Sequence, residues 1–120
     1  MAQAASNQVV ARKSALVAVA GKHGGKVDKH FGAAEVFAIY RLSSVDVEFV
    51  ETRAIDELAT PGEERRATIV RILGDCGFLL IEKVGEAPKK MLADAGIEAI
   101  DKYKGKEISF ALAALAEERL

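Results

Sequence analysis

Apolar and polar residues follow two spacings along the chain, one typical of strands and the other typical of helices. Short apolar runs predict five strands, at residues 15–20, 35–42, 47–53, 78–81 and 97–100. Apolar residues at helical spacing predict three helices, at residues 60–73, 88–95 and 106–118. Strands that alternate with helices in this way indicate an α/β domain.

The connections between these elements predict the order of the strands. Residues 43–46 are typical of a hairpin turn, which makes the second and third strands antiparallel neighbours. Helical connections between the later strands favour parallel pairing with right-handed crossovers. We therefore expect a ribonuclease H-like three-layer fold, with a mixed five-stranded sheet in the order 3-2-1-4-5 and about three helices. In that order a ligand crevice is expected beyond the first and fourth strands, where residues 21–32 and 85–88 meet.

Composition narrows the class of protein. Half of the 120 residues are hydrophobic, which is enough for one core, and the net charge of -1 provides no overall field for nucleic acid or anionic membrane. A single cysteine excludes an internal disulfide and fits a reducing compartment, and no apolar run is long enough to span a bilayer. We expect a cytoplasmic protein with one domain at residues 14–120, preceded by a flexible leader or linker remnant at residues 1–13.

The candidate chemistry is concentrated in residues 21–32, with the sequence GKHGGKVDKHFG. Three lysines (Lys22, Lys26 and Lys29) and one aspartate (Asp28) give this loop a charge of +2, which favours an anionic ligand. The loop also holds both histidines, His23 and His30, and a neutral imidazole coordinates transition metals. Asp28 could orient an imidazole by accepting its second N–H.

A structural interpretation of the same loop stays open. Exposed lysines are usually only solvated, and a lone histidine is more often structural than a metal ligand. Two histidines seven positions apart do not complete a structural zinc site, which takes about four ligands. The loop therefore predicts an open site that the protein alone does not complete.

Two motifs resemble those of a known family. The sequence VDKHFG at residues 27–32, followed by AAEVFAIY at residues 33–40, resembles the dinitrogenase iron-molybdenum cofactor biosynthesis family, with its NifX and NafY carriers and the C-terminal domain of NifB. A later set of residues resembles the second signature of that family, namely Asp75-Cys76, Lys83-Val84-Gly85, Pro88, Leu92 and Ala95-Gly96-Ile97. The resemblance extends over residues 15–113.

The resemblance implies a non-catalytic carrier that binds the iron-molybdenum cofactor or an iron-sulfur precursor cluster. The motif histidine of the family falls on His30. We expect the cofactor-binding residues to be His30, Lys22, Lys29, Asp28, Phe31 and Gly32, with His30 and His23 as metal ligands. The partners implied are metallocluster assembly proteins, with apo-dinitrogenase as a further candidate. Residues 54–62 lack the cysteine that NifB commonly has there, so ligation from that connection is not expected.

Other candidates carry less weight. Cys76 is a secondary metal ligand candidate, because it precedes the fourth strand and is expected roughly 20 Å from His30. Glu63 and Glu64 are expected as acids in the first turn of a helix. Residues 15–20 contain no acid, which argues against a two-metal nuclease.

The alternative function is a regulatory or scaffold domain that binds a small anionic or nucleotide ligand in the same crevice. A hydrolase with His30 as general base ranks last, because no nucleophile accompanies it.

Overall fold

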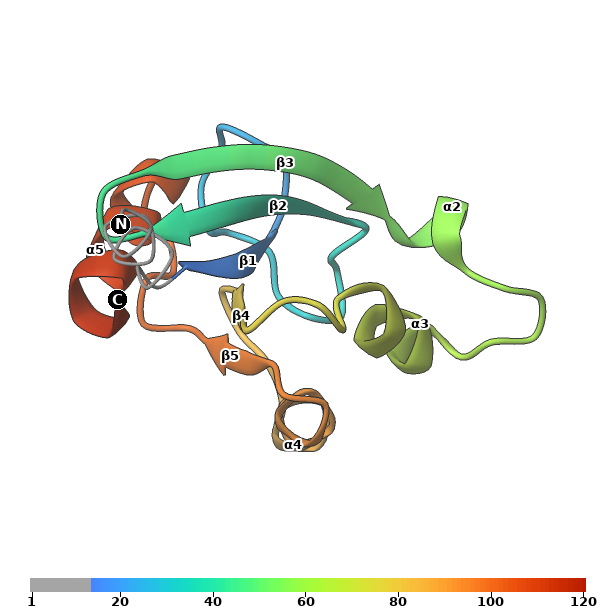
Figure 1. The fold of residues 1–120 in the computed structure, drawn as a ribbon. Helices are drawn as coiled ribbons and strands as arrows, with labels where there is room; N and C mark the ends of the chain where they lie inside the picture. Colours follow the sequence, from blue (N-terminus) through green and yellow to red (C-terminus); the bar gives the residue numbers. More distant parts are fainter. Residues whose placement is uncertain (1–13) are drawn as a thin grey trace, which may run out of the picture.

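The computed structural model describes residues 14–120, and a five-stranded sheet in the order β3-β2-β1-β4-β5 organises them (Figure 1). The strands are β1 (Ser14–Ala20), β2 (Val36–Ser43), β3 (Val47–Ala54), β4 (Phe78–Leu80) and β5 (Glu98–Ile100). The helices are α2 (Ile55–Leu58), α3 (Arg65–Ile72), α4 (Glu86–Asp94) and α5 (Ile108–Arg119). The leader proposed for residues 1–13 lies outside the described residues.

The strand directions confirm the predicted mixed sheet. β1 pairs antiparallel with β2 from Ser14 opposite Ser43 to Ala20 opposite Phe37. The other edge of β1 pairs in parallel with β4, and β4 pairs in parallel with β5. The hairpin between β2 and β3 is closed by the Ser43 hydroxyl, which accepts hydrogen bonds from the backbone N–H groups of Val45 and Asp46 at 3.3 and 3.1 Å.

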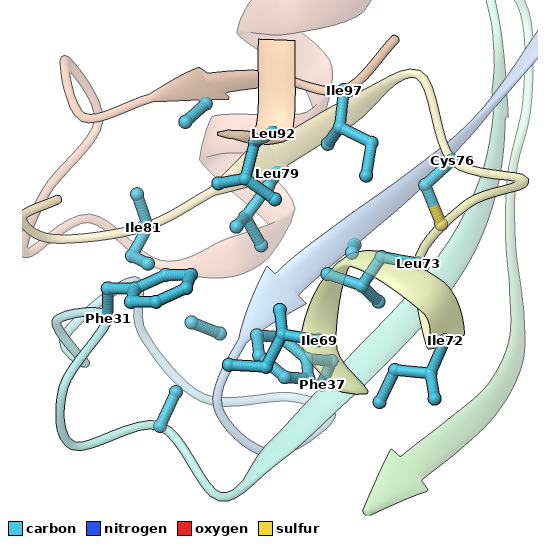
Figure 2. Close-up of a cluster of buried hydrophobic side chains, with 14 of the residues drawn as sticks. Phe31, Phe37, Ile69, Ile72, Leu73, Cys76, Leu79, Ile81, Leu92 and Ile97 are labelled. Carbon is cyan, nitrogen blue, oxygen red and sulfur yellow. The ribbon is translucent and has the colours of Figure 1, made fainter. Parts of the chain in front are cut away.

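Both faces of the sheet are buried, which makes the fold three-layered. Because successive side chains of a strand point to opposite faces, Phe37 and Ile39 of β2 join one core while Ala38 and Tyr40 join the other. The first core is covered by α3 and α4, and Figure 2 shows side chains of α3 facing Phe37. The second core is covered by α5, which buries Leu112 and Leu115.

The first long helix begins later than predicted. Residues 60–63 form a turn in which the Glu63 carboxylate accepts the Thr60 backbone N–H at 3.1 Å and the Arg71 Nε–H at 2.9 Å. Gly62 has a φ of 80°, a left-handed conformation that interrupts a right-handed helix. α3 therefore starts at Arg65 with Glu64 as its N-cap, so the expectation that Glu63 and Glu64 are first-turn acids was wrong.

The remaining differences are small. The connection after β3 contains a short unpredicted helix, α2, which buries Ile55. α4 begins at Glu86, two residues before the predicted start, because Pro88 is tolerated within the first turn, where no intrahelical donor is needed. In the part of the chain that the structure describes, no helix combines the length and the apolar character needed to cross a membrane.

Candidate functional site

Backbone pairing divides the glycine-rich loop into two arms. In the His23 arm (residues 22–27), the Val27 N–H donates to the Lys106 carbonyl at 2.9 Å, and the Gly25 carbonyl accepts the Ile108 N–H at 3.0 Å. This arm is therefore attached to the segment that enters α5. In the His30 arm (residues 29–32), the pairing partners lie just beyond β4 instead, so the two histidines of the loop are held by different parts of the fold.

The His30 arm extends the sheet beyond its regular strands. The Lys29 carbonyl accepts the Glu82 N–H at 2.9 Å, and the Phe31 N–H donates to the Lys83 carbonyl at 2.9 Å. The backbone of His30 is thus fixed on both sides. Its side chain remains exposed, and within residues 14–120 no hydrogen bond engages its ring. An imidazole on a fixed backbone with an unengaged ring is suited to ligand binding.

The exposed imidazole lines an open cleft with a volume of about 650 Å³, which we call the His30 cleft. Its walls are the His30 arm, the first turn of α3 and the segment that enters α4. The lining residues are His30, Phe31, Gly32, Arg65, Arg66, Lys83, Gly85 and Pro88. Three of them are cationic and none is acidic, so the cleft favours an anion. The α3 and α4 N-termini at its rim add partial positive charge.

The lysines of the loop lie outside the His30 cleft. Lys22, Lys26 and Lys29 line a second hollow of about 470 Å³, the lysine cavity, together with Asp28, Glu35 and the backbone of Gly21. The predicted site residues are therefore divided between two cavities. Lys22, Asp28 and Lys29 line the lysine cavity, whereas His30, Phe31 and Gly32 line the His30 cleft.

His23 is engaged by aromatic neighbours. Its Nδ1 lies 2.8 Å from the Tyr40 hydroxyl, and its ring stacks on Phe49 with 3.9 Å between the ring centroids. Tyr40 belongs to the core beneath α5, whereas Phe31 belongs to the core beneath α3 and α4. His23 and His30 thus lie toward opposite faces of the sheet. Within residues 14–120, no three His, Cys, Asp or Glu side chains gather as a metal site.

Cys76 is buried at the far end of the first core. Figure 2 shows it at one end of the cluster, with Phe31 at the other. Burial, reinforced by the Asp75 carboxylate, raises the pKa of the Cys76 thiol to about 12. The Arg53 guanidinium holds Asp75 at 2.7 Å and lowers the pKa of that carboxyl. The thiol is therefore protonated. Its place at the end of the core opposite Phe31 also keeps it away from the His30 arm.

A comparison with known protein families shows which family the chain belongs to. The family described as dinitrogenase iron-molybdenum cofactor matches residues 13–118. The chain belongs to this family. Among relatives of the family, NifB of Herbaspirillum seropedicae, a FeMo cofactor biosynthesis protein, is 41% identical over 93 residues, which are 75% of this chain and 18% of that protein. NifB of Sinorhizobium fredii is 36% identical over 107 residues, covering 87% of this chain and 22% of that protein.

The family match concerns one part of larger proteins, because the chain spans about a fifth of the length of these curated relatives. Among solved structures, the apo form of the orange protein from Desulfovibrio gigas superimposes with a TM-score of 0.64. It covers 90% of this chain and 92% of its own, at 21% identity, which supports the fold alone. The match of the family to residues 13–118 confirms the resemblance noted in the two sequence motifs.

Arg65, Arg66 and Lys83 line the cleft of this family member but were not among the predicted site residues. Lys83 was part of the second motif. Arg65 and Arg66 lie in the first turn of α3, where the helix dipole disfavours cations. Because the sequence predicted the start of this helix at residue 60, this unfavourable placement is visible only in the structure.

Proposed function

We propose that the protein binds an iron-molybdenum cofactor or an iron-sulfur precursor cluster in the His30 cleft and carries it during metallocluster assembly. The observation that carries this proposal is the exposed His30 imidazole in a cleft lined by three cations and no acid. The relatives named as FeMo cofactor biosynthesis proteins support the same class of cargo.

Two kinds of side chain in the cleft contribute to binding, a metal ligand and cations. His30 supplies a nitrogen ligand through its neutral imidazole, and Arg65, Arg66 and Lys83 attract the negative charge of the cluster. One protein ligand leaves the cargo exchangeable, which suits transfer to a second protein. The role requires binding and release only, so we propose a carrier and not an enzyme. Its proposed partners are the assembly proteins that supply the cluster and, as the recipient of the cluster, apo-dinitrogenase.

Anaerobic titration of the protein with isolated iron-molybdenum cofactor tests the proposal. The wild type should form a coloured complex, and His30→Ala should weaken it by at least about tenfold, because a metal-nitrogen bond is lost. The matched control is His23→Ala, which removes the imidazole of the other arm and should bind like the wild type. Equal affinity of His30→Ala and the wild type would remove His30 from the site.

The lysine cavity favours a second candidate function. Three lysines outnumber the two acids, Asp28 and Glu35, in a hollow of about 470 Å³, so we propose as the alternative a regulatory or scaffold domain that binds a small phosphate-bearing ligand there. Calorimetry with ATP and with pyrophosphate in metal-free buffer tests it. Binding by the wild type and its loss in Lys26→Ala would support the alternative, whereas no heat with either ligand would contradict it.

A further inference from the structure

Arg65 makes contacts that differ from those of the other cations in the His30 cleft. Its guanidinium donates a hydrogen bond to the Ala34 carbonyl and lies over the Phe31 ring, with 5.7 Å from Cζ to the ring centroid. Arg65 therefore reaches from the first residue of α3 to both the floor of the cleft and the turn that follows His30.

The turn after His30 is a small unit with two ends. The His30 carbonyl accepts the N–H groups of Ala33 at 2.9 Å and Ala34 at 3.1 Å, which closes the turn. Pairing with Lys83 fixes its near end, as described above. Its far end, at Ala34, is joined to α3 by the Arg65 guanidinium. A charge-assisted bond and a planar contact with an aromatic ring are both well suited to arginine and poorly replaced by lysine.

We infer that Arg65 is a positioning residue, which holds the turn at residues 30–34 against α3 and thereby slows the release of an anionic cluster from His30. This inference rests on the proposed function, because it assumes that the cluster occupies the His30 cleft. Arg66 lines the same cleft and supplies charge without this attachment. Both arginines thus attract the cluster by charge, and Arg65 also holds the turn at residues 30–34.

The matched variants Arg65→Met and Arg66→Met each remove one positive charge from the cleft. Two measurements separate them, namely amide hydrogen exchange of Ala33 and Ala34 in the cargo-free protein, and stopped-flow association and dissociation of isolated iron-molybdenum cofactor under anaerobic conditions. Arg65→Met should accelerate both the exchange and the dissociation by about tenfold, the effect of one lost hydrogen bond to a charged group. Arg66→Met should leave the exchange unchanged and should accelerate the dissociation less than Arg65→Met does, because it removes a charge but not the attachment of the turn.

Association should slow in both variants, because each loses a charge. Arg65→Lys should restore association while dissociation stays faster than in the wild type, a split that a general loss of stability would not produce. If Arg65→Met unfolds, Phe31→Leu, which removes the ring beneath the guanidinium, should still accelerate exchange and dissociation.

The inference is overturned if Arg65→Met and Arg66→Met match in exchange and dissociation, or if exchange rises while dissociation does not. If the wild type binds no cofactor, the proposed function fails, the positioning role fails with it, and the exchange measurement still shows whether Arg65 holds the turn.

Discussion

The two arms of the glycine-rich loop carry the same functional group in contrasting surroundings. His30 has a fixed backbone and an exposed ring beside Arg65, Arg66 and Lys83. His23 has its ring fixed, by the Tyr40 hydroxyl and the face of Phe49. The first imidazole keeps its nitrogen atoms for a ligand, whereas the second uses one of them within the protein.

The contrast shows that the neighbours contributed by distant elements decide what a histidine can do. Tyr40 and Phe49 face each other across β2 and β3, and together they provide a partner for His23. The neighbours of the His30 ring come from α3 and the segment that follows β4, and they provide positive charge. Histidine count and spacing alone do not distinguish these cases.

The largest expected effect concerns Cys76. If this thiol were a cluster ligand, the His30 ring would not be the group that distinguishes the binding arm from the other. With its pKa raised to about 12 by burial, the thiol should be protonated at pH 8. Since the thiolate is the reactive form, labelling with a disulfide reagent should be about a thousandfold slower than for an exposed cysteine. Absorbance of the released thiol measures the rate, with the urea-unfolded protein as control. Rapid labelling of the folded protein would show that Cys76 is accessible after all.

Two phenylalanines, Phe31 next to His30 in the chain and Phe49 stacked on His23, give the next largest effect. Phe31 is 6% exposed and Phe49 is 41% exposed. Phe31→Ala should lower the free energy of unfolding by about 3 kcal/mol, through lost burial and a cavity in the first core. Phe49→Ala should lower it by about 1 kcal/mol, the worth of an exposed aromatic stack. Urea denaturation measures both, and equal losses would contradict the view that Phe31 is a core residue whereas Phe49 is a half-exposed neighbour of His23.

How far the sequence predicts this molecule depends on the range of the interactions involved. The strand order followed from local signals, such as the turn at Ser43 and the helical connections after β4. The start of α3 was misjudged because the local turn at Gly62 was not recognised and because the Glu63 side chain is bound by Arg71, eight positions away. The separation of Lys29 from His30 into two cavities depends on pairing with residues 82–83, which no local pattern reveals.

A smaller effect distinguishes the two cavities as sites for the same cargo. Lys83→Gln removes a charge from the His30 cleft, and Lys26→Gln removes one from the lysine cavity. We expect Lys83→Gln to weaken cofactor binding by about fivefold at low salt, as for one surface charge near an anion, and Lys26→Gln to change it by less than about twofold. Anaerobic titrations at two salt concentrations measure this, since added salt should shrink the difference. An equal loss in both variants would mean that the cargo extends into both cavities.

An effect of similar size concerns the hydrogen bond that holds His23. Tyr40→Phe removes the hydroxyl that lies 2.8 Å from Nδ1 and should lower the free energy of unfolding by about 1 kcal/mol, the net worth of one hydrogen bond. Tyr103→Phe is a matched control, because the hydroxyl of this mostly buried tyrosine is 3.5 Å from the Glu118 carboxylate, a longer and weaker contact. Cofactor affinity should be unchanged in both variants, because Tyr40 belongs to the core on the opposite face of the sheet from Phe31. A loss of affinity in Tyr40→Phe alone would show that fixing the His23 arm also fixes the His30 arm, and the two would then act as one site.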